Sequence, residues 1–161
     1  LDAANIDLKM FDEKKHLKYT GGELKHVLNS LIILKEEKVW LEITNLLIPG
    51  WNDDLKKFEE MCIWIKKNLG SDIPLHISRF FPHYNLEDIK PTPIETLHNA
   101  KKIASEYLKY VYLGNVAEES NTYCPKCNAL LIRRTGYFIE NKVKNGKCFN
   151  CKKEISGIFI N

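Results

Sequence analysis

The chain has no long hydrophobic run, no basic leader and no starting methionine. None of its apolar runs approaches the length needed to span a bilayer, so we expect no contact with a membrane. It begins at Leu1, inside an expected strand, which suggests a piece of a longer protein. Nothing in the sequence indicates an oxidising compartment, and the expected location is the cytoplasm. A hydrophobic content of 44% and a charged content of 28% are typical of an ordinary globular domain.

Most of the chain lacks an excess of positive charge, but the segment near its carboxyl end has one. Residues 121–161 carry eight Lys or Arg against two Glu, whereas the other 120 residues carry 16 Lys or Arg against 19 Asp or Glu. Such a split indicates two segments under different constraints. We therefore predict two domains, residues 1–118 and residues 119–161.

Three apolar runs each end in polar residues and are followed by a longer amphipathic stretch. They cover residues 4–9, 39–50 and 75–80, and a fourth run covers residues 110–115. This repeat of strand, loop and helix predicts an α/β domain with a parallel sheet, whose chemistry lies at the carboxyl ends of the strands. An antiparallel sheet with one solvated face is the alternative.

The runs alternate apolar and polar residues, and successive side chains of a strand point to opposite faces. One face should therefore pack against helices, while the other is polar. The expected polar side chains are those of Asn5, Asp7, Lys9, Glu42, Thr44, His76 and Ser78. A barrel filled with a dry core would be apolar on both faces, so the pattern favours a polar lumen that binds a ligand. Four strands do not close a barrel, and we expect an open arc whose first strand is an exposed edge.

Three helices are predicted from apolar spacing and capping signals. The first runs from about Gly22 to Glu37, with Thr20 as the first residue of a capping box. The second starts after residues 52–54, buries Cys62 and stops at Gly70, and the third has Thr92 as its cap. The loop of residues 81–91 is either a ligand-contacting loop or a surface connection.

Two cysteine pairs, Cys124–Cys127 and Cys148–Cys151, each enclose two residues, and 20 residues separate the pairs. This spacing predicts a small four-cysteine module of the zinc-ribbon type, in which a hairpin brings the pairs together around one ion. Asn128 and Lys152 would occupy the tight turns that let backbone amides donate to the thiolates. Iron in a rubredoxin-like site is the main competitor, and two disulfides are the alternative in an oxidising compartment.

Several segments together resemble those of a known enzyme family. They are Asn5-Ile-Asp-Leu-Lys-Met-Phe-Asp12, Leu47-Ile-Pro-Gly-Trp-Asn-Asp53, His76-Ile-Ser-Arg-Phe-Phe-Pro82, Gly114-Asn-Val116 and Asn121-Thr-Tyr-Cys-Pro-Lys-Cys127. Their order and spacing resemble radical S-adenosylmethionine (SAM) enzymes of the pyruvate formate-lyase activating type, and most closely the radical SAM proteins of the AmmeMemoRadiSam system. The resemblance implies that residues 1–118 are the C-terminal half of a partial TIM-type (β/α) barrel.

The resemblance also implies residues that bind SAM. Asp7 and Lys9 match the segment that contacts SAM, and Thr44 and Leu46 match residues that pass near its adenine. A histidine near the next strand also approaches SAM in relatives, for which His83 is the candidate and Arg79 the alternative. The remaining candidates for the lumen or for substrate contact are Asn5, Glu42, His76, Ser78 and Asn115.

One element of the family pattern is missing. Radical SAM enzymes hold a [4Fe-4S] cluster with a Cys-x3-Cys-x2-Cys loop, and this sequence contains no such triplet. Gly21-Gly22-Glu23 is not the family's SAM-binding Gly-Gly-Glu stretch, because it precedes a helix at the wrong place. The chain alone is therefore expected to be inactive. Its expected partners are an N-terminal half-barrel, an electron donor and a substrate that could be a protein, and the parent enzyme would make a 5′-deoxyadenosyl radical.

The sequence leaves two alternative functions open. A basic four-cysteine module with Tyr137 and Phe138 exposed could bind nucleic acid or protein, although the lack of a dense basic run makes nucleic acid the weaker choice. The domain of residues 1–118 could also be an enzyme in its own right with Glu42 or His76 as a general base, but no nucleophile accompanies them in a known arrangement.

Overall fold

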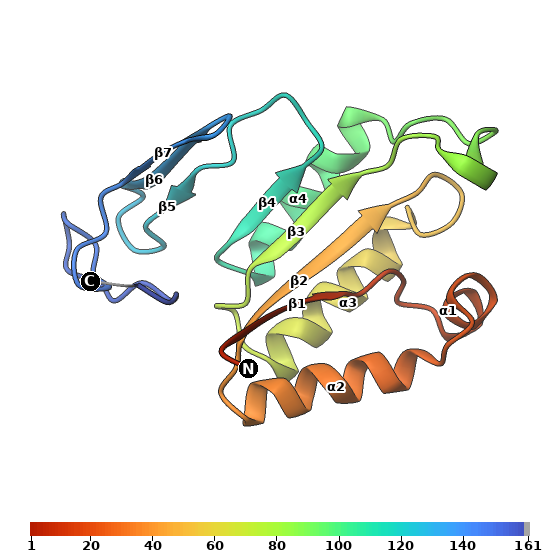
Figure 1. Ribbon diagram of the computed structural model, residues 1–161, viewed down its shortest axis with the longest axis horizontal. Helices are drawn as coiled ribbons and strands as arrows, with labels where there is room; N and C mark the ends of the chain where they lie inside the picture. The colour runs from red at the N-terminus through yellow and green to blue at the C-terminus, as the bar shows by residue number, and fades with distance from the viewer. Residues whose placement is uncertain (160–161) are drawn as a thin grey trace. The chain divides into compact units, whose positions relative to one another are not determined.

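A computed structural model describes residues 1–159 (Figure 1). It divides into two compact units, the first spanning Leu1–Val116 and the second beginning at Ala117. In the part of the chain that the structure describes, no helix is both long enough and apolar enough to cross a membrane.

The first unit contains one parallel sheet. Its strands are β1 (Ala3–Asp7), β2 (Trp40–Leu47), β3 (Leu75–Arg79) and β4 (Val111–Gly114). They lie side by side in chain order and every neighbouring pair is parallel, so the antiparallel alternative is wrong. The helices are α1 (Glu13–Thr20), α2 (Leu24–Glu36), α3 (Leu55–Asn68) and α4 (Ile94–Tyr107), and a short 3-10 turn, η1, covers Tyr84–Leu86. The predicted α/β fold with a parallel sheet is therefore confirmed.

Helices cover one face of this sheet, and α3 and α4 lie behind it in Figure 1. Strand β2 alternates buried and half-buried residues along its whole length, as expected when only one face is packed. Side chains from alternate positions of β2 and β3 form the core with apolar residues of the helices. The core residues include Leu41, Ile43, Leu47, Phe58, Met61, Ile65, Leu75, Ile77, Leu97, Ala100 and Ala104.

Helix α3 has the limits that its sequence predicts. The side chain of Asp54 accepts hydrogen bonds from the backbone N–H groups of Lys56 and Lys57, and Gly70 follows the helix with a φ of 99°. Cys62 is completely buried on the packed face, as predicted, and burial raises the pKa of its thiol to about 12. Cys62 is therefore a core residue rather than a reactive thiol.

Helix α1 was not predicted, and the capping role given to Thr20 is wrong. Asp12 caps this helix by accepting from Lys15 N at 2.9 Å, and Thr20 is its last residue. The Thr20 hydroxyl donates to the carbonyl of His16 at 2.8 Å. Among residues of α1 only His16 is buried, so the segment lacks the apolar spacing that would have indicated a helix.

The capping role predicted for Thr92 is also wrong. Helix α4 begins after Pro93 with no side-chain cap, and Thr92 is completely buried. Its hydroxyl donates to the carbonyl of Leu47 at 2.6 Å and accepts from Phe80 N at 3.1 Å. The Thr92 side chain therefore links the carboxyl ends of β2 and β3 and does not cap the first turn of α4.

The second unit contains an antiparallel sheet of three strands, β5 (Thr122–Tyr123), β6 (Leu130–Thr135) and β7 (Phe138–Asn141). Strands β6 and β7 form the hairpin that separates the two cysteine pairs. Among the residues of this unit up to residue 159, the buried apolar side chains are few: those of Cys124, Leu131, Cys148 and Ile155. So small a core makes a bound ion important for the stability of this unit.

Candidate functional site

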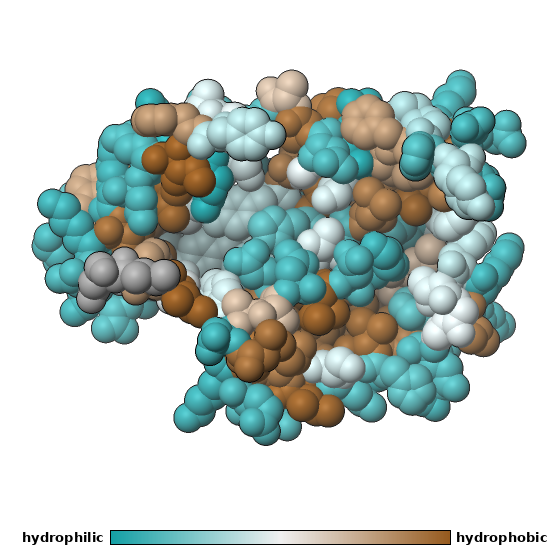
Figure 2. All heavy atoms as spheres, viewed as in Figure 1, coloured by the Kyte–Doolittle hydropathy of each residue, from teal (hydrophilic) through white to brown (hydrophobic). Residues whose placement is uncertain are grey.

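The sheet face without helices carries the polar side chains expected there. Asn5 pairs in register with Glu42, and Asp7 pairs with Thr44, which in turn pairs with His76. These residues alternate with the buried core positions, so they share the face opposite helices α3 and α4. That side of the sheet is the one seen in Figure 1. Figure 2, drawn from the same side, shows hydrophilic side chains gathered over the front of the sheet. Their placement agrees with the predicted alternation, and their roles stay predictions.

The polar side chains of this face pair with one another. The hydroxyl of Thr44 donates to Asn5 Oδ1 at 2.8 Å. Glu42 Oε1 accepts from Trp40 Nε1 at 3.1 Å, and Glu42 Oε2 lies 2.7 Å from His76 Nε2. Because a carboxylate accepts, this contact requires the proton of His76 to be on Nε2. The Glu42–His76 pair is about one-third exposed, so its polar groups remain accessible from the open face.

Asp7 and Lys9 lie at the carboxyl end of β1. Lys9 Nζ contacts Asp7 Oδ2 at 2.8 Å, and the two side chains are 40% and 54% exposed, respectively. An ion pair so exposed contributes little to stability, typically about 0.2–1 kcal/mol. Both groups are therefore free to exchange this contact for one with a ligand at small cost.

A pocket of about 300 Å³ opens at the carboxyl ends of β1 and β2. Its lining residues are Lys9, Met10, Tyr19, Thr20, Leu46, Ile48, Trp51 and Asn52. The rings of Tyr19 and Trp51 stack with centroids 3.9 Å apart and planes 14° apart. The structure thus brings two of the predicted SAM residues, Lys9 and Leu46, to one pocket with an aromatic wall.

Six of the eight lining residues were not predicted as site residues, among them Tyr19, Trp51 and Asn52. Trp51 and Asn52 follow the Pro49-Gly50 end of the second strand run, and that position alone could have indicated them. No local signal indicated Tyr19, since it lies on the unpredicted helix α1.

Arg79, His83 and Asn115 do not line this pocket. Arg79 lies on the face of β3 that carries Ile77, and its Nε donates to the carbonyl of Thr92 at 2.8 Å. His83 is exposed and directly precedes η1. Asn115 has a φ of 58° and donates to the carbonyl of Arg79 at 3.1 Å.

Ser78 lies on the open face beside Gly114, as its position in the register requires. A Cβ atom on Gly114 would come within 2.9 Å of the Ser78 hydroxyl oxygen. Glycine at position 114 therefore keeps this part of the face open, and a larger residue would displace Ser78.

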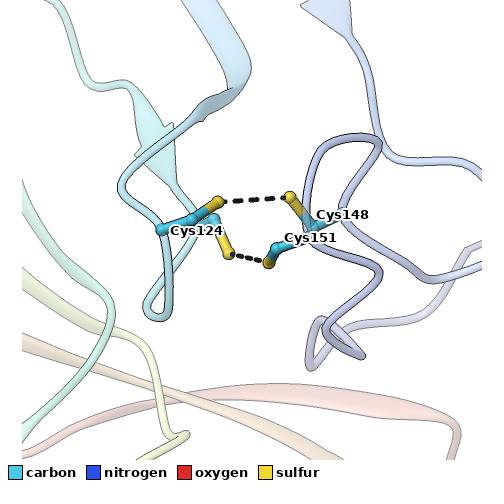
Figure 3. A group of neighbouring side chains, drawn as sticks. Cys124, Cys148 and Cys151 are labelled. Carbon is cyan, nitrogen blue, oxygen red and sulfur yellow. Dashed lines mark hydrogen bonds between the residues drawn. The ribbon is translucent and has the colours of Figure 1, made fainter.

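The second unit brings its four cysteines together. The sulfur atoms of Cys124, Cys127, Cys148 and Cys151 all lie within 4.8 Å of one another. Two of the pairs, Cys124–Cys151 and Cys127–Cys148, are separated by 3.6 and 3.7 Å, and Figure 3 shows thiols from two loops turned toward one another. A tetrahedral ion with metal–sulfur bonds of about 2.3 Å places its ligands at such separations, so the group can hold one metal ion.

The turns after each cysteine pair have the predicted geometry. Asn128 and Lys152 have φ values of 56° and 60°, in the left-handed region. The backbone N–H of Ala129 lowers the pKa of the Cys127 thiol to about 6. The N–H of Lys153 acts in the same direction on Cys151, but burial and the neighbouring thiols raise the pKa of Cys151 to about 11. Backbone donors therefore favour thiolates here, which is what a metal ion requires.

Two known proteins are similar to this chain in sequence, and one of them is named as a putative activating enzyme. No model of a protein family matches it. An uncharacterized protein of Methanocaldococcus jannaschii is 42% identical over 161 residues, covering 96% of this chain and 48% of that protein. A putative glycyl-radical enzyme activating enzyme of the same organism is 29% identical over 115 residues, covering 69% of this chain and 44% of that protein. The chain thus spans about half the length of the curated relatives it matches.

One solved structure has a similar fold. A domain of pyruvate-formate lyase-activating enzyme from Bacteroides vulgatus aligns with a TM-score of 0.60 and 19% identity, covering 71% of this chain and 68% of that chain. The chain is therefore distantly homologous to a putative activating enzyme, and its α/β fold with a parallel sheet and four helices is similar to that of an activating-enzyme domain.

Proposed function

We propose that this chain is the C-terminal part of a radical SAM enzyme and that its first unit is half of a (β/α) barrel. A preceding segment would complete the barrel along β1, which is an edge of the sheet. The open polar face would then line the lumen. The observation that best supports this proposal is the pocket at the strand ends, because two residues inferred from the resemblance, Lys9 and Leu46, both line it.

Residues at the carboxyl ends of β1 and β2 would bind SAM. The carboxylate of Asp7 and the ammonium of Lys9 suit the amino group, carboxylate and ribose hydroxyls of SAM. Thr44 and Leu46 would pass near the adenine ring. The stacked rings of Tyr19 and Trp51 add an apolar wall with π faces that can attract the positive sulfonium.

The iron–sulfur cluster would be held elsewhere in the longer protein. Four of the five cysteines converge on one site in the second unit, and the fifth, Cys62, is completely buried. A reduced cluster held in that other part of the longer protein would supply the one electron needed to cleave SAM into methionine and a 5′-deoxyadenosyl radical. The residues of this chain would orient SAM and the substrate and keep water from the lumen. Activation of a glycyl radical enzyme is the role that the named relatives favour.

The four cysteines of the second unit would hold zinc in a closed structural site. All four positions are filled by sulfur, which leaves no open position for a substrate. Iron in the same ligand set is the alternative. In either case the ion would stabilise the small second unit rather than take part in catalysis.

Replacing Asp7 by Ala in the longer protein should weaken SAM binding by about tenfold, the loss expected for one charge-assisted contact. Isothermal titration calorimetry with SAM measures the dissociation constant. Asp72→Ala is a matched control, because Asp72 also forms an exposed ion pair with a lysine, Lys109. Asp72 precedes the amino end of β3, whereas the pocket lies at the carboxyl ends of the strands. Equal affinities for the wild type and the Asp7 variant would count against the assignment.

A further inference from the structure

The end of β1 is held by side chains rather than by the sheet. The last backbone hydrogen bond from β1 to β2 runs from Leu8 N to Thr44 O at 2.9 Å. Beyond it, the carbonyl of Lys9 accepts from Asn52 Nδ2 at 2.5 Å and from Asn45 Nδ2 at 3.3 Å. The backbone of a predicted cofactor-binding residue is thus fixed by two asparagine amides.

Asn52 makes three such bonds. Its amide nitrogen donates to Lys9 O and, at 2.8 Å, to Leu46 O, and its oxygen accepts from Ile48 N at 2.7 Å. Both N–H groups and the oxygen of the amide are therefore used. Asn52 is half-buried and itself lines the pocket that Lys9 and Leu46 share.

Asn45 supports the same strand end from the packed face of the sheet. It is 2% exposed, and its amide nitrogen donates to Leu8 O at 2.6 Å. The carbonyls of Leu8 and Lys9 fix the orientation of this amide, because its oxygen would be repelled by them. Asn45 and Asn52 therefore hold the backbone of Leu8 and Lys9, where the chain leaves the sheet after β1.

We propose that Asn52 is a positioning residue that acts through Lys9 and Leu46, so that both meet SAM in the correct geometry. This inference rests on the proposed SAM site. The lysine side chain is flexible, and its ammonium can reach a fixed place only if its backbone is held. Misplacement of a binding group by about 1 Å is enough to cost a large part of its effect. No other described side chain hydrogen-bonds to both Lys9 and Leu46.

The test is the Asn52→Asp substitution in the longer protein. It keeps the side-chain size and the bond from Ile48 N, but directs a carboxylate oxygen at the carbonyls of Lys9 and Leu46. SAM affinity should fall about tenfold or more. Asn52→Ala removes the bonds without adding repulsion and should also lower SAM affinity. It replaces the Asp variant in the experiment if that variant does not fold.

Thr92→Val is the control for a purely structural effect. Thr92 also uses a buried polar group to join two strand ends, those of β2 and β3, outside the pocket. The Thr92→Val substitution should lower the melting temperature but leave SAM affinity unchanged. If it weakens SAM binding as much as the Asn52 variants do, Asn52 has no special positioning role.

A double-mutant cycle with Lys9→Ala tests whether Asn52 acts through Lys9. Without the lysine side chain, the loss of SAM affinity caused by Asn52→Asp should shrink from about tenfold to a smaller factor, because only the contribution through Leu46 remains. A persisting tenfold loss would overturn the proposal, as would Asn52 variants that bind SAM as tightly as the wild type. If the wild type itself does not bind SAM, the proposed function is wrong. That outcome differs from failure of the positioning role, in which the wild type binds SAM but the Asn52 variants behave as it does.

Discussion

Replacing Cys148 by Ser is expected to remove one equivalent of bound metal and to unfold the second unit. Cys148 is completely buried, and its sulfur lies 3.7 Å from that of Cys127. A hydroxyl does not ionise to replace the fourth thiolate, and a structural zinc ion contributes about 10–16 kcal/mol of apparent binding free energy. That exceeds what the few buried side chains of this unit can supply without the ion.

The experiment combines metal analysis of the purified protein with NMR spectra of its backbone amides. The variant should lose the metal and the dispersed signals of the second unit, and a strong chelator should do the same to the wild type. Cys62→Ser is the matched control, because Cys62 is buried in the first unit and should leave the metal content unchanged. The analysis also distinguishes zinc from iron. A Cys148 variant with its full metal content would contradict the four-cysteine site.

Replacing Ile77 by Asp is expected to unfold the first unit. Ile77 is completely buried on the face of β3 that packs against the helices. A carboxylate there would lose its hydration without a partner and would also leave apolar surface unfilled, at a cost of roughly 4 kcal/mol or more. That is a large part of the stability of a typical domain. Thermal unfolding followed by circular dichroism measures the effect.

Ser78→Asp is the matched control for that experiment. Ser78 follows Ile77 in the same strand but lies on the open polar face, so its substitution should change the melting temperature by only a few degrees. The difference between the two neighbours tests which face is packed. Equal destabilisation by both substitutions would mean that the face bearing Ser78 is buried in a core as well, and that the polar lumen is absent.

Much of the fold could be predicted because its signals are local. Alternation in β2 identifies the packed face, since each residue's burial depends only on the side to which it points. The spacing of the cysteine pairs and the left-handed turns at Asn128 and Lys152 follow from the geometry of one ion and four thiolates. In these cases a short stretch of sequence determines the structure.

The errors arose where distant parts of the chain decide a residue's role. Thr92 has the sequence context of a helix cap, but it bonds to Leu47, 45 residues away. Asn52 was expected only in the segment that starts the second helix, but its amide joins the ends of two strands. Helix α1 is stabilised by its cap and by the buried His16 rather than by an apolar stripe. Such long-range polar contacts leave no periodic pattern in the sequence.

The proposed SAM site lies at the carboxyl ends of β1 and β2. Photolabelling of the longer protein with an azido derivative of SAM, followed by mass spectrometry of the peptides, tests it most directly. We expect labelled peptides from residues 7–9 and 44–52, with labelling suppressed by excess unmodified SAM. Labelling confined to the second unit or to the helix-covered face of the sheet would contradict it.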